Sequence, residues 1–339
     1  MSEIDTILEA AVTLRAEGTP MALATVVSVR GSSYRRPGAR LLVPAEGAPI
    51  GIISGGCLEE EAARLARQAL ADDAPLIVTI DHSAEGDELW GMGLGCRGVI
   101  DLLAEPPSMA ADTLDALRLA RSDRQPSYLL TDLAGERRRL SAAEADALGE
   151  RAVLAVAHGR PVRIGDVVLD PILPPLHLVV CGAGPDAEPL VAGALRQGWR
   201  VDVVDPRRSL LRPGRFRGAQ LLDVEAPQAG EATDAGEWTA VVVMSHDYLR
   251  DAAFTGGFAG RGVMYLGILG PRDRTDRLLA ELDPPLGAGD LSVLHAPAGL
   301  DIGADGAEQV ATAIVAEILA VLHGRGAGPL RDRPGPIHG

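Results

Sequence analysis

A short glycine-rich turn between a strand-like run and a helical pattern is the feature that most restricts the fold of this chain. The run His177–Cys181 is almost entirely apolar, as in a strand that is buried on both faces. Residues 182–187 then read GAGPDA, the G-x-G-x-x-A pattern of loops that approach a pyrophosphate. After a helical pattern, a second apolar run, 201–204, ends at Asp205. This order predicts a parallel strand–helix–strand unit.

The residues of this unit are candidates for nucleotide binding. Asp205 lies 21 residues after Gly184, near the distance at which a carboxylate accepts a hydrogen bond from a nucleotide ribose. We therefore take Gly182, Gly184 and Asp205 as candidate cofactor-binding residues. Arg207 and Arg208 leave open a different interpretation, in which this place meets an additional phosphate. A scaffold of the same shape that holds no nucleotide is a further alternative, because fold and function separate easily.

The second half of the chain continues in the same manner. Apolar runs at 220–222, 240–244 and 263–268 each lead into a helix or a loop, which predicts a mainly parallel sheet with helices on its faces. Ligands of such sheets bind beyond the carboxyl ends of the strands. One such end carries His246 and Asp247, which we interpret as structural or solvated residues, since adjacent residues usually point apart.

Three prolines between residues 171 and 175 indicate a stiff linker, and we place the domain boundary there. The fold class is therefore α/β. An N-terminal mixed α/β domain over residues 1–175 is followed by a C-terminal Rossmann-like domain over residues 176–324. Residues 325–339 are rich in glycine, proline and arginine, which predicts a disordered tail.

The N-terminal domain shows alternating helix and strand patterns. Apolar residues at helical spacing predict helices in the first 17 residues and after Leu58. Extended runs predict strands, and one of them leads directly into a glycine pair and a cysteine. The expected strands are 21–29, 39–43, 50–54, 76–80 and 99–104, with a helix at 110–121 and strands at 127–131 and within 162–169.

Two cysteines in glycine-rich surroundings carry the chemistry of this domain. Cys57 ends the segment Ser54-Gly55-Gly56-Cys57, and Cys96 ends Gly93-Leu94-Gly95-Cys96. Thiols bind soft ligands, so Cys57 and Cys96 are candidate contacts to sulfur or to a thiophilic metal centre. Glycine permits close approach of the backbone, so Gly55 and Gly56 are candidate cofactor-binding residues beside them. Alternatively, both cysteines pack as small apolar residues. Cys57 would lie at a helix start, where N–H groups stabilise a thiolate while the adjacent glutamates oppose it, so the direction of its pKa shift is open.

A loop with two arginines is a candidate phosphate site. Arg35 and Arg36 lie between Ser32 and Gly38, in a segment that offers guanidinium, hydroxyl and backbone N–H donors. The alternative is a pair of solvated arginines. Other basic clusters at 137–139 and 207–208 also leave room for small anions.

Composition excludes several classes of function. A net charge of −15 argues against nucleic-acid binding. The chain shows neither a leader pattern nor a run of about eighteen apolar residues, so we expect a cytoplasmic protein without membrane segments. Three cysteines far apart give no disulfide framework and no close-spaced zinc pattern.

Taken together, the motifs resemble the XdhC/CoxI family, the accessory chaperones of molybdenum-containing hydroxylases such as xanthine dehydrogenase. The resemblance covers almost the whole ordered chain in one order. It rests on residues 31–40, 54–59 and 93–96 in the first domain and on residues 182–187, 245–248, 265–270 and 299–304 in the second.

The resemblance implies a protein that binds the molybdenum cofactor, in the molybdopterin or a dinucleotide form. Such a protein protects the cofactor, supports its sulfuration and inserts it into an apo molybdenum hydroxylase, with a cysteine desulfurase as sulfur donor and without turnover of its own. We also expect a homodimer, since twofold pairs are common. The second candidate is an NAD(P)-dependent oxidoreductase, although Pro185 and Asp186 depart from the family's usual fingerprint. A thiol enzyme that uses Cys57 is the third.

Overall fold

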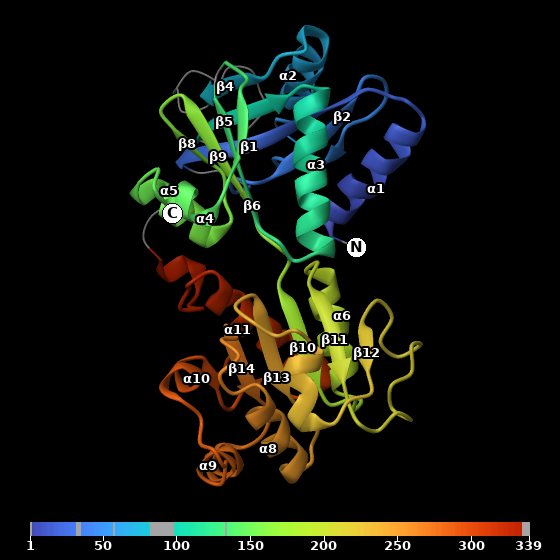
Figure 1. Cartoon of the computed structure of the whole chain (residues 1–339), viewed down its shortest axis with the longest axis vertical. Coiled ribbons are helices and arrows are strands. Elements are labelled where there is room, and N and C mark those ends of the chain that lie inside the picture. The colour runs from blue at the N-terminus through green and yellow to red at the C-terminus, as the bar shows by residue number, and fades with distance from the viewer. Residues whose placement is uncertain (1, 32–34, 57, 82–97, 133, 334–339) are drawn as a thin grey trace. The chain divides into compact units, whose positions relative to one another are not determined.

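The computed structural model describes residues 2–31, 35–56, 58–81, 98–132 and 134–333. The chain divides into two compact units, an N-terminal unit built mainly of residues 3–174 and a C-terminal unit of residues 175–329. Figure 1 labels many of the elements of each unit. No helix within the described ranges is long and apolar enough to cross a membrane.

The N-terminal unit is built around a five-stranded antiparallel sheet with the order β3-β2-β1-β5-β4. Helix α2 packs on one face, and helices α1 and α3 pack on the other. Along β1, Ala22, Ala24 and Val26 face α2, whereas Met21 and Leu23 face α1 and α3, which explains why this strand is apolar on both faces. The bounds are α1 Glu3–Ala16, β1 Met21–Gly31, β2 Arg40–Pro44, β3 Ile50–Gly51, α2 Glu59–Asp72, β4 Leu76–Asp81, β5 Gly98–Glu105 and α3 Pro107–Ser122.

A second antiparallel sheet of the same unit has the order β7-β6-β9-β8. Helices α4 and α5 pack against it through a small apolar core. Ser141 and Glu144 form a capping box at the start of α4, which satisfies two backbone N–H groups. The bounds are β6 Ser127–Asp132, β7 Arg137–Leu140, α4 Ala142–Asp146, α5 Glu150–His158, β8 Val162–Ile164 and β9 Val167–Ile172.

Buried ion pairs link the two sheets. Arg40 on β2 donates from Nη2 to both carboxylate oxygens of Asp170 on β9, at 2.9 and 2.7 Å. Arg137 on β7 pairs with Glu105 on β5. Burial raises the pKa of Glu105, although the charges of Arg137 and Arg40 counteract it. The expectation that cluster 137–139 meets solvent anions is therefore wrong for Arg137, because its guanidinium is fixed inside the unit.

The C-terminal unit holds a six-stranded, all-parallel sheet with the order β12-β11-β10-β13-β14-β15. This is the strand order of a Rossmann fold. Helices α6 and α11 cover one face, and α8 and α9 cover the other. The α/β class predicted from the sequence is confirmed, with an N-terminal mixed unit and a C-terminal Rossmann domain. The main bounds are β10 His177–Cys181, α6 Ala187–Arg196, β11 Arg200–Val204, β12 Gln220–Leu222, β13 Thr239–Val243, α8 Tyr248–Gly257, β14 Tyr265–Ile268, α9 Arg272–Ala280, β15 Leu294–His295 and α11 Ala307–Leu322.

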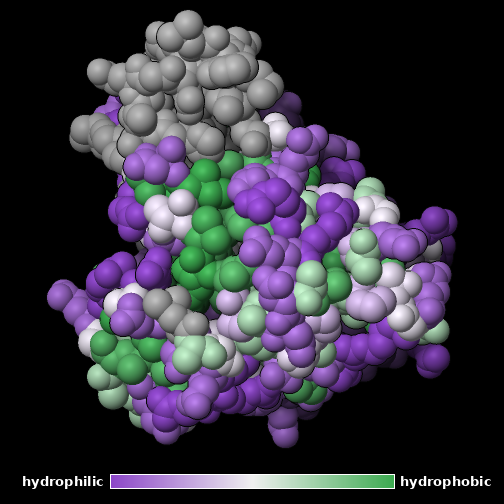
Figure 2. All heavy atoms as spheres, turned by 90° about the horizontal axis from the view of Figure 1, so that it is seen from above, coloured by the Kyte–Doolittle hydropathy of each residue, from purple (hydrophilic) through white to green (hydrophobic). Residues whose placement is uncertain are grey.

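Short helices complete the description: η2 Ala226–Gln228, α7 Ala229–Ala232, α10 Ala288–Ser292 and η3 Leu330–Asp332. The last of these lies in the segment expected to be a disordered tail and forms one 3-10 turn. On the face of the molecule shown in Figure 2, polar side chains cover most of the surface and hydrophobic ones gather in a few areas, since the apolar faces of strands and helices are used in the cores.

One expected strand is shorter than predicted. The run 50–54 forms a strand only over Ile50–Gly51. Beyond it, the backbone N–H of Ile52 donates to a carboxylate oxygen of Glu3, and that of Ser54 donates to Glu59. Side chains have thus replaced the neighbouring strand as hydrogen-bond partners of this segment, which the apolar pattern could not indicate.

Candidate functional site

The loop between β3 and α2 is organised by the carboxylate of Glu59. This side chain accepts hydrogen bonds from the backbone N–H groups of Ser54 (2.9 Å), Gly56 (3.1 Å) and Leu58 (3.2 Å), and from the Ser54 hydroxyl. The Ser54 hydroxyl oxygen also accepts from the N–H of Leu58 at 3.0 Å. One buried serine and one carboxylate therefore fix the backbone on both sides of position 57.

The charge of Glu59 is stabilised by this arrangement. Burial opposes ionisation, but the hydrogen bonds from Ser54 and from the loop N–H groups outweigh it, and the pKa of Glu59 is lowered. The N–H groups of Gly56 and Leu58, which flank Cys57 in the chain, are thus directed to a carboxylate. These two N–H groups are therefore already used by a side chain of the same loop.

We expect Glu59→Gln to loosen this loop while the unit stays folded. A hydrogen bond to a charged group contributes about 1.5–3 kcal/mol, so amide hydrogen exchange at Ser54, Gly56 and Leu58 should accelerate about tenfold or more. Glu60→Gln is the matched control, because Glu60 is exposed on the same helical turn. Equal exchange rates in the two variants would show that the carboxylate of Glu59 does not hold the loop.

The arginine loop is tied to the same place through Glu3 of α1. Arg35 forms an ion pair with Glu3, and the other oxygen of that carboxylate accepts from the N–H of Ile52 at 3.2 Å. About one third of the Arg35 side chain is exposed, and Arg36 is partly buried. Glu3 therefore joins the Arg35 segment to the chain that leads into Ser54.

The two glycines of the β3–α2 loop have room for their backbone among the described residues. Gly55 and Gly56 are exposed, and a Cβ added at Gly56 would meet no atom of the described residues within 4 Å, its chain neighbours aside. Gly56 has φ +110°, a conformation that favours glycine. Of the predicted site residues, Arg35 is thus linked through Glu3 to Ile52, three residues before Gly55 in the chain. Cys57, Cys96 and Ser32 lie outside the described residues, and within the described ranges no group of three or more His, Cys, Asp or Glu side chains could hold a metal ion.

The remaining predicted residues lie at the carboxyl edge of the Rossmann sheet. Gly182 has φ +120°, and a Cβ there would come within 2.8 Å of backbone atoms of Met244 and Ser245 at the end of β13. The first glycine of the fingerprint is therefore required by the neighbouring strand. At Gly184 an added Cβ would make only an ordinary contact, 3.8 Å from the His246 ring.

Asp205 braces the fingerprint loop. Its Oδ2 accepts from the Ala183 N–H at 2.8 Å, and its carboxylate also pairs with the Arg207 guanidinium. Burial opposes ionisation of Asp205, but the hydrogen bonds from Arg207 and Ala183 prevail and lower its pKa. The contact of Asp205 with a nucleotide stays a prediction. In the structure, the carboxylate accepts hydrogen bonds from Ala183 and Arg207.

Two further residues fix this loop, and the sequence analysis did not select them for that role. Arg215 donates to the carbonyl oxygens of Ala183 (3.0 Å) and Gly184 (3.1 Å). His246 has a positive φ of 59°, and its Nε2 lies 2.9 Å from a carboxylate oxygen of Asp186. Arg215 belongs to no recognisable motif, so the sequence could not indicate its role. His246 follows a predicted strand, and it was noted in the sequence for that position.

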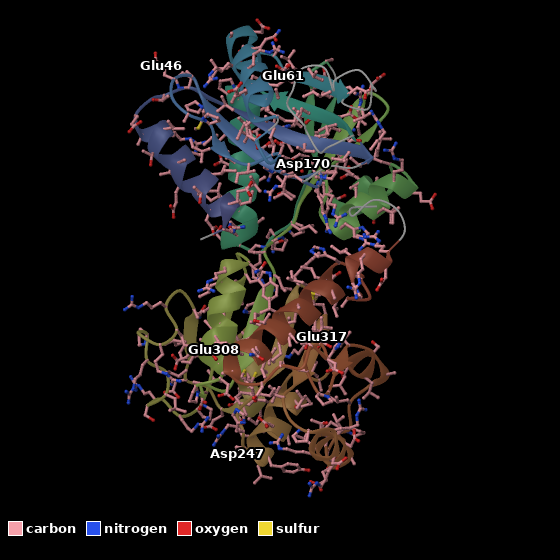
Figure 3. The ribbon with its side chains drawn as sticks, turned by 180° about the vertical axis from the view of Figure 1, so that it is seen from behind. Glu46, Glu61, Asp170, Asp247, Glu308 and Glu317 are labelled. Carbon is pink, nitrogen blue, oxygen red and sulfur yellow. The ribbon has the colours of Figure 1, made fainter. Side chains whose placement is uncertain are left out.

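The other motifs of the C-terminal unit are joined by buried carboxylates. Asp251 accepts from the backbone and hydroxyl of Ser245 and pairs with Arg274. Glu317 on α11, labelled in Figure 3, accepts from the Tyr265 hydroxyl at 2.6 Å and from the Gly299 N–H at 2.8 Å. An acidic residue on an otherwise apolar helix face was the available signal for Glu317.

Comparison with known proteins places the chain in a family. Residues 14–81 match the model of the XdhC and CoxI family, and residues 178–318 match that of the XdhC Rossmann domain. A probable xanthine dehydrogenase subunit from Bacillus subtilis (strain 168) is 32% identical over 310 residues, which are 88% of this chain and 92% of that protein. The chain belongs to the XdhC and CoxI family.

Two other relatives extend the comparison. The molybdenum cofactor insertion chaperone PaoD of Escherichia coli (strain K12) is 25% identical over 94% of this chain and 89% of its own length. A crystal structure of a xanthine dehydrogenase from Bacillus halodurans superposes with a TM-score of 0.74 at 27% identity and covers 98% of both chains. Both similarities span the N-terminal unit as well as the Rossmann domain.

Proposed function

We propose that this protein binds the molybdenum cofactor and delivers it to a molybdenum hydroxylase of the xanthine dehydrogenase family. The family and the similarity to an insertion chaperone over 94% of the chain carry the proposal. Protection of the cofactor during sulfuration, a cysteine desulfurase as sulfur donor, a homodimeric state and a cytoplasmic location belong to the same proposal.

The described residues of the N-terminal unit fit the phosphate end of such a cofactor. Arg35 offers a partly exposed guanidinium that is linked through Glu3 to Ile52, and the glycines at 55 and 56 that follow in the chain are exposed. Guanidinium groups bind phosphate oxygens with two parallel hydrogen bonds. When bound, the cofactor would supply a molybdenum centre whose sulfur or oxygen ligands can be exchanged, and we assign its soft contacts to Cys57 and Cys96.

The carboxylate of Glu3 would compete with the phosphate for the guanidinium of Arg35. Its carboxylate already pairs with Arg35 and accepts from Ile52, so an incoming phosphate would take over the guanidinium from Glu3. Because the pair is partly exposed, this exchange requires little reorganisation. Binding at Arg35 would therefore be coupled to the contact between α1 and the segment that leads into Ser54.

The proposal is tested by measuring molybdenum and pterin in the purified full chain, produced in cells with an active cofactor pathway. We expect both to co-purify with the natural sequence, and to fall about tenfold or more in Cys57→Ala and Arg35→Gln, a change that corresponds to roughly 1.4 kcal/mol. Cys181→Ala and Arg118→Gln are the matched controls, because Cys181 is buried in the Rossmann core and Arg118 is exposed on α3.

Absence of both molybdenum and pterin from the natural protein would contradict the proposal. So would full retention in Cys57→Ala together with full activity of the client hydroxylase in the same cells. If the two control variants lost molybdenum and pterin to the same extent, general destabilisation would explain the loss. The roles proposed for Cys57 and Arg35 would then be wrong.

A further inference from the structure

The carboxyl end of β11 is where dinucleotide-binding domains hold the ribose of a nucleotide. In that position a carboxylate accepts hydrogen bonds from a free ribose diol, whereas an arginine accommodates a ribose phosphate. Here the position carries both kinds of residue, Asp205 and Arg207. The hydrogen bonds of the two side chains decide which of them is available to a ligand.

The acceptor capacity of Asp205 is filled by the chain itself. Its Oδ1 accepts from the backbone N–H of Arg207 at 2.8 Å and from the guanidinium Nε at 2.9 Å. Its Oδ2 accepts from the backbone N–H of Ala183 at 2.8 Å and from Arg207 Nη2 at 2.7 Å. A carboxylate offers about four acceptor positions, and the Asp205 side chain is fully buried. No acceptor is left for a ribose hydroxyl.

Arg207 presents the opposite chemistry to a ligand. Its Nε and Nη2 are used by Asp205, while Nη1 makes no hydrogen bond within the described part of the chain. The side chain is 39% exposed, and the next residue, Arg208, is exposed as well. A second acid that acts on the Arg207 charge, Asp247, is itself paired with Arg250 at 3.8 Å. The position therefore offers N–H donors and positive charge.

We propose that the Rossmann domain selects a nucleotide whose ribose carries a phosphate at this position and rejects one with a free 2′,3′-diol. The hydroxyl groups of a diol would face the Asp205 carboxylate, whose acceptor positions are all occupied. A ligand whose polar groups find no partner in a buried site binds much more weakly than one whose groups do. A phosphate would accept from Arg207 Nη1 and from Arg208 without disturbing the Asp205 contacts. This selectivity goes beyond the proposed chaperone function and does not depend on it.

The preference is measured by calorimetric titration of the full chain with adenosine 2′,5′-bisphosphate and ADP, and with NADP⁺ and NAD⁺. We expect the ligand with the 2′-phosphate to bind at least about tenfold more tightly in each pair. In Arg207→Gln, Asp205 regains acceptor positions, so the preference should reverse toward ADP and NAD⁺. Arg208→Gln should weaken phosphate binding without creating affinity for the diol.

Arg217→Gln is the control, because this arginine is exposed on the same β11–β12 connection and does not contact Asp205. The readout is the ratio of two affinities measured on one sample, which partial unfolding of a variant leaves unchanged. Equal affinities in each pair, tighter binding of NAD⁺ than of NADP⁺, no binding of any of the four ligands, or an unchanged preference in Arg207→Gln would each overturn the inference. None of these results bears on molybdenum or pterin content.

Discussion

Replacing Asp170 with alanine is expected to destabilise the N-terminal unit by about 3–5 kcal/mol. Arg40 is only 4% exposed and would lose both of its contacts to Asp170, at 2.9 and 2.7 Å, while its remaining side-chain contact to Thr25 is with a neutral hydroxyl. A buried guanidinium that loses the carboxylate to which it is hydrogen-bonded is costly, even though the charge of Glu105 still acts on it. Asp170 is labelled in Figure 3.

The measurement is the denaturant midpoint of the transition that belongs to the N-terminal unit. Asp166→Ala serves as control, since Asp166 is exposed in the turn between β8 and β9, and exposed substitutions usually change stability by less than about 0.5 kcal/mol. The double variant Arg40→Met, Asp170→Leu should be more stable than Asp170→Ala, because it removes both charges together. A double variant as unstable as the single one would indicate that packing, and not the unpaired charge, dominates.

Gly182→Ala is expected to lower the free energy of unfolding of the C-terminal unit by at least about 3 kcal/mol, because the alanine would strain the backbone and its Cβ would overlap neighbouring backbone atoms. The alanine Cβ would stand 2.7 Å from Ser245 Cα and 2.8 Å from Met244 O, and φ is +120°. Backbone atoms in a parallel sheet cannot move aside as a flexible side chain can. The expected result is a lower midpoint of the transition that belongs to the Rossmann domain.

Gly184→Ala is the matched control two residues away. Its added Cβ would lie 3.8 Å from the His246 ring, an ordinary contact, so we expect a change below about 1 kcal/mol. Thermal unfolding and far-UV circular dichroism of both variants check the difference. If the two alanines destabilised the protein equally, the close approach of β10 to β13 would not be the reason for the first glycine.

The sequence predicted the Rossmann domain well because its signals are local. The run His177–Cys181 is apolar for burial on both faces, and the fingerprint turn and the run 201–204 follow at fixed spacing. The N-terminal strand at 21–29 was found by the same property, and those at 76–80 and 99–104 were found as extended runs. The expected strand at 50–54 was too long, because Glu3 and Glu59 provide hydrogen-bond partners from outside the sheet.

The sequence indicated which residues belong to the candidate site, but it did not indicate the contacts between them. Glu3 joins Arg35 to Ile52, which precedes the glycine pair at 55–56 in the chain. From the sequence, Glu59 was only one of the glutamates adjacent to Cys57 at the expected helix start. Its actual role, as acceptor for three loop N–H groups, follows from a fold-back that spacing alone does not show.

By itself, the sequence determined the α/β class, the parallel order of the C-terminal domain and the family, because periodicity and motif spacing are properties of neighbouring residues. Only the tertiary structure decided the partners of the charges. Arg137 is buried in an ion pair with Glu105, and the carboxylate of Asp205 accepts hydrogen bonds from the Ala183 N–H and the Arg207 guanidinium. Such pairings depend on which strands become neighbours and on how much water remains, and both are set by the packing of segments that are distant in the chain.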